Sequence, residues 1–367
     1  MNAAQTTEIP LTAGTFPQIA ERIGRIYHPA GQPVWVHGSP GIGKSQLGLY
    51  LAEYLETLTG NPHGFIDIRA QQMSEVDGRG VPFPSEVDKK TYWYHPAFWP
   101  DEQRDGKYGI LLLDELPSAP LAVQASLYQL ILDGRLGEYV LPKGWYIVAA
   151  GNLPTDRAVV HRISSALSRR FAHAHLLVVV DPWCKWAISK GGRFGPFEPE
   201  TVAYIRFRGE RLHDFQPDQL QDANPRSWEF VDNCLKMNKA AATNGGAVEG
   251  AEELATYAGV IGEPDAIEFT AWLQMYRSLP NIDGILLNPG AAKVPDPAQE
   301  ANVAYAIVTE LSRRVNQQNF HNAMEYVGKI GGDFEAVFVK DAAVRCPDIQ
   351  NTPEFITWAA DNTDVYL

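Results

Sequence analysis

The chain has 367 residues, of which 45% are hydrophobic and 20% are charged, enough for a sizeable core and two domains. Its formal net charge of −13 opposes broad non-specific binding to nucleic acid. No run of about 18 apolar residues predicts a membrane-spanning helix. The three cysteines are widely spaced, and no basic patch followed by an apolar run opens the chain. We therefore expect a cytoplasmic protein with neither a disulfide framework nor a zinc site.

The first stretches of the chain lead into a strand. Residues 1–14 have the composition of a flexible tail, and residues 15–27 carry apolar side chains at helical spacing. Residues 34–37 (Val-Trp-Val-His) form a short apolar run bounded by Gly31 and Pro33, which predicts a buried strand.

A glycine-rich loop follows this strand and fits the pattern G-x-x-x-x-G-K-[ST] in full. It reads Gly38-Ser39-Pro40-Gly41-Ile42-Gly43-Lys44-Ser45, and a helical pattern begins at Gln46. Gly41 and Gly43 allow the backbone N–H groups to turn inward around a phosphate, and the positive end of the helix adds to that field. Lys44 would reach the β- and γ-phosphates, and Ser45 would bind Mg²⁺. We assign residues 38–46 to nucleotide binding.

A second strand, over 64–69, completes a β-α-β unit, and its crossover predicts a parallel sheet covered by helices on both faces. Residues 71–108 interrupt this pattern with a turn-rich segment at 77–84 and a short strand near 89–95, typical of an inserted hairpin. The five aromatic residues of this insert leave two interpretations open. They either pack the insert locally or contact another chain: Tyr92, Trp93, Tyr94, Phe98 and Trp99.

A continuous apolar run over 109–113 ends in the carboxylates Asp114 and Glu115. Such a run is typical of a central parallel strand with functional groups at its carboxyl end. In this position Asp114 would hold Mg²⁺ through water, and Glu115 would orient and polarise the attacking water.

The next segment predicts a helix over 121–132, a hairpin over 136–146 that turns near 142–144, and a buried strand over 146–150. This strand delivers Asn152, which would hydrogen-bond the attacking water or the γ-phosphate. A strand over 174–180 follows, and Arg169 or Arg170 just before it would project from the edge of the subunit.

Beyond residue 181 the pattern is helical. We expect helices over 183–190, 199–215, 248–261, 264–278, 297–317, 318–329 and 353–361, with a connection over 279–297. Asn224 and Pro225 form a strong helix start that places Arg226 in the first turn, where it would touch the γ-phosphate or be solvated.

The order of these motifs resembles that of the AAA+ ATPases, and within them the MoxR group, over about residues 15–235. The resemblance rests on the phosphate loop, the Walker B strand at 110–115, the sensor 1 position Asn152, the Ala-Leu-x-x-Arg-Phe element at 166–171 and the sensor 2 position Arg226. The 71–108 segment resembles the helix-2 insert of this clade. The resemblance implies a three-layer αβα core with a parallel sheet over 15–180, a helical lid over 181–282 and a helical extension over 283–367.

The resemblance also implies a homo-oligomeric ring, commonly a hexamer, with ATP and Mg²⁺ at the subunit interfaces. Arg170 would be the arginine finger that acts on the neighbour's nucleotide, with Arg169 as the second choice. Arg226 would act from the lid, on its own subunit or on the adjacent one.

Three functions are open at this point. The first is a chaperone-like ATP hydrolase that remodels or activates a protein partner, in some relatives one with a von Willebrand factor A domain. The second is a nucleic-acid motor or the NTPase of a restriction or mobile-element system. The third is a nucleotide-gated scaffold, which the set of Asp114, Glu115 and Asn152 disfavours because a scaffold needs no hydrolytic groups. The acidic charge balance favours the first.

Overall fold

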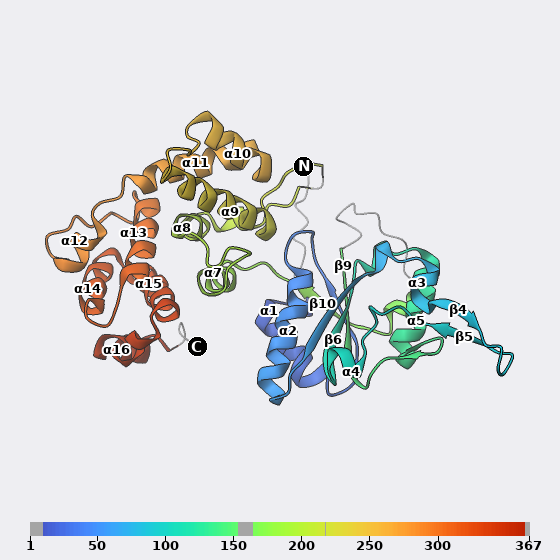
Figure 1. Cartoon of the computed structure of the whole chain (residues 1–367). Coiled ribbons are helices and arrows are strands. Elements are labelled where there is room, and N and C mark those ends of the chain that lie inside the picture. Colours follow the sequence, from blue (N-terminus) through green and yellow to red (C-terminus); the bar gives the residue numbers. More distant parts are fainter. Residues whose placement is uncertain (1–9, 153–163, 217, 364–367) are drawn as a thin grey trace, which may run out of the picture. The chain divides into compact units, whose positions relative to one another are not determined.

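The protein is represented by a computed structural model that describes residues 10–152, 164–216 and 218–363. The chain divides into two compact units, Met1–Leu177 and Val178–Leu367 (Figure 1). Most of the expected tail, residues 1–9, lies outside the described residues.

The N-terminal unit is built on a six-stranded sheet in which every neighbouring pair is parallel. The strand order is β1-β10-β2-β9-β6-β3, so the predicted parallel sheet is confirmed. The strands are β1 (Ala13–Gly14), β2 (Val34–His37), β3 (Gly64–Arg69), β6 (Tyr108–Asp114), β9 (Gly144–Gly151) and β10 (Ala172–Leu176).

Helices cover both faces of this sheet, as the continuous apolar runs of its central strands require. Strand β6 shows why, because its successive side chains point to opposite faces. Leu111 and Leu113 belong to the same buried cluster as residues of α5 (Leu121–Asp133). Leu112 lies toward α2 (Lys44–Thr59), where a Cβ on Gly48 would be only 3.4 Å from its side chain. Helix α1 (Phe16–Arg22) continues into a π-helical turn (Ile23–Tyr27), and α1 and α2 lie on one side of the sheet in Figure 1. The three-layer αβα core is therefore present.

The 71–108 segment contains the predicted hairpin. Strands β4 (Val81–Pro84) and β5 (Thr91–Tyr94) pair antiparallel and project from the unit, between the short helices α3 (Glu75–Arg79) and α4 (Glu102–Asp105) (Figure 1). One of the five aromatic residues packs locally, and the other four are exposed. Trp99 is 1% exposed and its indole N–H donates to the Gly78 carbonyl at 3.2 Å, whereas Tyr92, Trp93, Tyr94 and Phe98 are exposed.

Three local predictions in this unit are wrong. The tail ends before residue 14, because Ala13 and Gly14 pair with the last strand as β1. The hairpin after α5 turns at residues 137–138, not near 142–144: β7 (Arg135–Leu136) pairs with β8 (Tyr139–Val140), and Gly137 has a φ of +62°, which glycine adopts readily. The strand expected over 174–180 ends at Leu176, since α7 (Val180–Ser189) already begins at Val180.

The C-terminal unit is a set of helices. These are α7, α8 (Pro199–Phe207), α9 (Pro225–Ala242), α10 (Ala251–Ile261), α11 (Glu263–Arg277), α12 (Ile282–Leu287), α13 (Ala301–Arg314), α14 (Phe320–Ile330), α15 (Gly332–Arg345) and α16 (Pro353–Asp361). No helix in the described parts of the chain is long and apolar enough to cross a membrane.

Two hydrophobic clusters hold these helices together. One is formed mainly by α7 to α11, around side chains such as Trp228 and Phe269, and the other by α12 to α16, around Phe320 and Phe338. Helix α13 serves both clusters, because Ala306 packs in the first and Ile307 in the second. The division of this unit at residue 282 into a lid and an extension stays an expectation.

The helices differ from prediction in three places. The helix expected over 199–215 stops at Phe207 and is followed by a 3₁₀ turn (Gly209–Leu212). Helix α12 lies in the expected connection over 279–297. Helix α15 was not predicted, because apolar side chains surround much of its circumference and leave no clear amphipathic stripe: Phe334, Ala336, Val337, Phe338 and Val339 are all buried or half-buried.

Candidate active site

The candidate site lies where neighbouring parallel strands end. His37, the last residue of β2, pairs with Gly151 of β9, which Asn152 follows directly. Leu113 of β6 pairs with Ala149, so that Asp114 ends β6 at the same edge. Carboxyl ends of parallel strands are where ligands bind in open α/β sheets. The topology brings the glycine loop after His37, Asp114 and Asn152 to this edge from separate parts of the sequence.

The glycine loop between β2 and α2 has the backbone that its sequence predicts. Gly41 and Gly43 have φ values of +77° and +92°, in the left-handed region that favours glycine. A Cβ at Gly43 would also lie 3.0 Å from the ring of Phe16. Helix α2 begins at Lys44, directly after Gly43, so the last two residues of the loop form the start of the helix. The N–H groups of its first turn and its positive dipole end therefore belong to the loop.

Lys44 connects the loop to Asn152. Its ammonium donates to the carbonyl oxygens of Gly38 at 2.7 Å and Ser39 at 2.8 Å, and to the Asn152 Oδ1 at 2.7 Å. The Lys44 ammonium would be within reach of a phosphate oxygen that took the place of the Asn152 amide oxygen. The structure thus brings together two predicted residues that are 108 positions apart.

Ser45 and Asp114 form the second polar contact of the site. The Ser45 hydroxyl donates to the Asp114 Oδ2 at 2.5 Å, and the Asp114 Oδ1 accepts from the Glu115 N–H at 2.9 Å. Asp114 is only 7% exposed. A hydroxyl and a carboxylate are the oxygen ligands that Mg²⁺ prefers, and this ion usually takes few protein ligands beside water and substrate phosphates. The described residues include no group of three or more His, Cys, Asp or Glu arranged to hold a metal.

Glu115 has an unusual backbone. Its φ of +54° lies in the left-handed region, which is costly for a residue with a side chain. The chain then turns at once into a 3₁₀ segment (Leu116–Ser118). Glu115 thus lies at the turn between β6 and the 3₁₀ segment, and the residue is half-buried.

The three predicted arginines are exposed. Arg170 lies just before β10 and its guanidinium approaches Tyr128 of α5, with 3.4 Å between Nη2 and the hydroxyl and 6.0 Å to the ring centroid. Arg169 precedes it at the end of a short helix (Ser165–Ser168). Arg226 lies in the C-terminal unit, in the first turn of α9, where its N–H donates to the capping Asn224 side chain at 3.0 Å as predicted. The remaining predicted positions, Pro40, Ile42 and Gln46, lie in the loop and the first turn of α2, with Ile42 buried and Gln46 exposed.

One residue next to the loop was missed. His37 stacks between His173 and His175 of β10, with ring centroids 5.0 and 5.1 Å away, and its Nε2 lies 2.7 Å from the His173 Nδ1. Burial, together with these two imidazoles and Lys44, lowers the pKa of His37 to about 3. His37 is therefore neutral near pH 7, beside the loop. The alternation of His173 and His175 along one strand was the available signal.

Comparisons with known proteins place no established family on this chain. No protein-family model matches it, and no curated protein sequence matches it either. Among solved structures it is similar to an ATPase from Cytophaga hutchinsonii described as putative, at 12% identity and a TM-score of 0.33, over 95% of this chain and 81% of that one.

Two further similarities are of the same kind. NtrX from Brucella abortus in complex with ADP has 14% identity and a TM-score of 0.39, over 94% of this chain and 64% of that one. The RuvB Holliday junction branch migration motor of Thermotoga maritima has 14% identity and a TM-score of 0.37, over 81% and 87%. Similarity at this level does not assign an activity, which depends on the geometry of the site.

Proposed function

We propose that this chain is an ATP hydrolase of the AAA+ type. The observation that carries the proposal is the convergence at one sheet edge of two contacts, Lys44 with Asn152 and Ser45 with Asp114. A structural glycine turn would need neither a lysine held at the loop nor a hydroxyl paired with a buried carboxylate. Both are the groups that phosphoryl transfer requires around a nucleoside triphosphate.

In the proposed mechanism the loop N–H groups and Lys44 bind the β- and γ-phosphates. Ser45 and Asp114 would hold Mg²⁺, which when bound offsets the charge on the phosphate oxygens. Glu115 orients and polarises the water for in-line attack on the γ-phosphate, and Asn152 positions that water or a γ-phosphate oxygen. His37 stays neutral and therefore adds no second cation beside Lys44.

We infer further that the active form is a ring, in which Arg170 of one subunit acts on the nucleotide of the next. Its exposure at the end of the segment before β10 supports this role, because a residue that acts in trans has to lie on the surface of its own subunit. Arg169 is the alternative finger, and Arg226 would complete the site from the C-terminal unit. The ring size and a MoxR-type assignment rest on the resemblance of the motifs.

For the work that hydrolysis drives, we propose remodelling or activation of a protein partner, for which a von Willebrand factor A protein is one candidate. The charge of −13 supports it. The alternative, a nucleic-acid motor, has one observation in its favour. The projecting hairpin exposes Tyr92, Trp93 and Tyr94 beside Lys89 and Lys90, and exposed aromatic rings next to cations can stack on bases.

The central test is Glu115→Gln, which preserves shape and removes the carboxylate. We expect the variant to bind a fluorescent ATP analogue as the parent does and to lose turnover, because the water is no longer polarised. Glu138→Gln, an acidic residue between β7 and β8 outside the site, is the matched control and should keep full turnover. Unchanged turnover in Glu115→Gln would remove Glu115 from the mechanism.

A second measurement separates the two kinds of partner. Turnover should not respond to single- or double-stranded DNA or to RNA if the partner is a protein. Stimulation by nucleic acid that falls steeply as salt rises would favour the motor instead.

A further inference from the structure

The C-terminal unit contains a cavity of about 750 Å³ that no part of the proposed ATPase mechanism uses. It opens where the two hydrophobic clusters of this unit meet. Its walls come from the start of α8, from Lys239 of α9, from the end of α11 and the following loop, and from α13 and α15. A cavity of this size lies within the range of small-molecule sites.

The walls of the cavity carry more cations than anions. Among its lining residues, the carboxylates are Glu198, Glu200 and Glu310. The cations are Lys239, Arg277, Arg313, Arg314 and Arg345. This excess of positive charge is found in a chain whose net charge is −13, so the cavity wall is opposite in sign to the protein as a whole.

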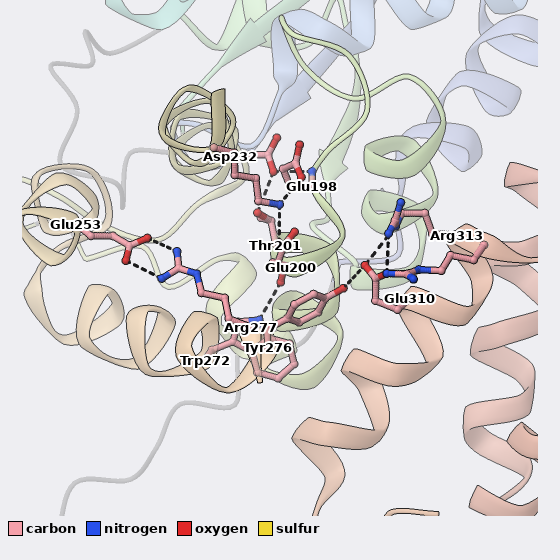
Figure 2. Close-up of polar contacts among 12 residues, drawn as sticks. Glu198, Glu200, Thr201, Asp232, Glu253, Trp272, Tyr276, Arg277, Glu310 and Arg313 are labelled. Carbon is pink, nitrogen blue, oxygen red and sulfur yellow. Dashed lines mark hydrogen bonds and ion pairs between the residues drawn. The ribbon is translucent and has the colours of Figure 1, made fainter. Parts of the chain in front are cut away.

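Glu310 is the centre of the basic side of the cavity. Its side chain is 6% exposed, and it accepts from Arg313 at 2.7 Å, from Arg314 at 2.9 Å and from the hydroxyl of Tyr276 at 2.8 Å. Figure 2 shows Tyr276 and Arg313 converging on this carboxylate. One buried carboxylate thus serves two guanidinium groups, and a second carboxylate, the exposed Asp283, meets only Arg314.

Two other cations of the cavity wall, Arg277 and Lys239, each have carboxylate partners at short distance. Arg277 is held by both oxygens of Glu253, at 2.6 and 3.0 Å (Figure 2). Lys239 contacts Glu198 at 2.6 Å and Glu200 at 2.5 Å. The excess of positive charge therefore lies on the α13 and α15 side.

Arg345, the last residue of α15, forms no ion pair with a carboxylate among the described residues, although the nearby Asp341, whose Oδ2 is likewise buried without a hydrogen-bond partner, acts on its charge. Its Nε and Nη2 are buried and have no hydrogen-bond partner among the described residues. The nearest acid along its helix, Asp341, is engaged by the buried Arg206 instead. Burial lowers the pKa of the Arg345 guanidinium, although Asp341 acts in the opposite direction. A buried guanidinium with unsatisfied donors is costly unless an acceptor is supplied.

We propose that this cavity binds a small, multiply charged oxyanion, a phosphate ester or a polycarboxylate, through Arg313 and Arg345. The planar fork of a guanidinium matches both kinds of oxyanion in two parallel hydrogen bonds. The ligand would supply the charge that Glu310 alone does not supply. Because the walls come from helices of both clusters, the bound ligand would also hold the last five helices to the preceding ones.

The test uses isothermal titration calorimetry on the full chain carrying Lys44→Ala, which weakens the competing phosphate loop. The probes are inorganic pyrophosphate for the phosphate source and citrate for the carboxylate source, with chloride at matched ionic strength as the blank. Binding of either probe at one site per chain supports the proposal, and whichever probe binds identifies the ligand class.

Substitutions with opposite expected effects on the affinity then test whether the probe binds in the cavity. Arg345→Gln should weaken binding about tenfold or more, since a charged hydrogen-bond donor is lost. Glu310→Gln should strengthen it, because the internal carboxylate no longer competes for Arg313. Arg193→Gln, an exposed arginine outside the cavity, should leave the affinity unchanged. Opposite shifts at two wall positions cannot arise from general loss of stability.

Two results would overturn the proposal. One is no binding of either probe at millimolar concentration. The other is an equal affinity in the parent and in Arg345→Gln. If circular dichroism shows that Arg345→Gln does not fold, Arg313→Gln takes its place, since the side chain of Arg313 is 42% exposed and its replacement leaves Arg314 on Glu310.

Discussion

The two polar sites of this protein differ in how their charges are balanced. At the sheet edge, Lys44 and Asp114 already have partners, Asn152 and Ser45, that a nucleotide and its ion would displace or share. In the wall of the C-terminal cavity, Nε and Nη2 of Arg345 find no hydrogen-bond acceptor in the part of the chain that the structure describes. The first site is preformed by backbone, through glycines with positive φ and the ends of parallel strands. The second is formed by side chains of helices that meet from separate clusters.

This difference decides whether each site can be recognised from the sequence alone. A loop that has to follow one backbone path needs particular residues at fixed spacing, so it can be recognised in a single chain. A cavity lined from α8, α9, α11, α13 and α15 needs only that certain helix faces meet. Its arginines lie at 277, 313, 314 and 345, a spacing that carries no signal before the packing is known.

Among the variants that test the sheet-edge site apart from the cavity, Arg170→Ala is expected to cause the largest loss of turnover. If Arg170 completes the neighbour's site, turnover should fall by roughly 10³–10⁵, the range for loss of an arginine finger. Nucleotide affinity should change little, because the subunit's own loop is intact. Steady-state ATP hydrolysis and analogue binding measure the two quantities.

Arg169→Ala is the matched control, since it removes the neighbouring exposed cation. A larger loss in Arg169→Ala than in Arg170→Ala would exchange their roles. Addition of a Lys44→Ala subunit, which retains Arg170, to Arg170→Ala subunits should restore part of the turnover. No restoration in mixed assemblies would contradict action in trans.

A smaller loss is expected from Asn152→Ala. Removal of one preorganised polar group at a reacting centre costs about 10²–10³ in rate, and here the variant also removes the acceptor that holds Lys44. Turnover should fall by about that factor while the fold is kept. Asn61→Ala, in an exposed turn after α2, is the control. A variant with the same turnover as the parent would place Asn152 outside the chemistry.

The sequence predicted the N-terminal unit well because its elements have strong local signals. The apolar runs of β6 and β9 are buried on both faces, so length and flanking residues identify them without knowledge of the partner strand. The failures lie where a local signal competed with tertiary context. Pro142 and Gly144 suggested the hairpin turn, yet Gly137 makes it with a φ of +62°.

The C-terminal unit was predicted less completely for a physical reason. Helix α15 packs against several neighbours at once, so its apolar residues do not form a stripe. Arg345 at its end was not a candidate, because its significance depends on Asp341 being engaged by Arg206. Such three-residue charge balance exists only in the folded state.

A pH dependence is expected from His37 beside the phosphate loop. The pKa of His37 is about 3 in the folded chain, against 6.5 for the free side chain, so the unfolded state binds more protons between these values. The free energy of unfolding should therefore be highest above pH 6.5 and decrease as the pH falls toward 3. Chemical denaturation between pH 4.5 and 7.5 measures this slope.

The His37→Gln variant should lose part of the slope, because glutamine does not titrate. His321→Gln, whose imidazole is exposed and pairs with Glu354 on the surface, should keep it. Equal slopes in the parent and in His37→Gln would show that His37 does not remain neutral in the folded chain.

The smallest effect tests whether the two sites act separately. Arg345 lies in α15 and contributes nothing to the proposed hydrolytic groups, so Arg345→Gln should leave turnover within about twofold of the parent, as expected for sites that share no residues. The comparison is made in saturating ATP without added oxyanion, and then with whichever of pyrophosphate or citrate binds the cavity. Turnover that changes with the probe in the parent, and not in Arg345→Gln, would mean that the cavity regulates hydrolysis. A large loss of turnover in Arg345→Gln without any probe would instead show that α15 supports the catalytic state, and the two sites would have to be treated as one system.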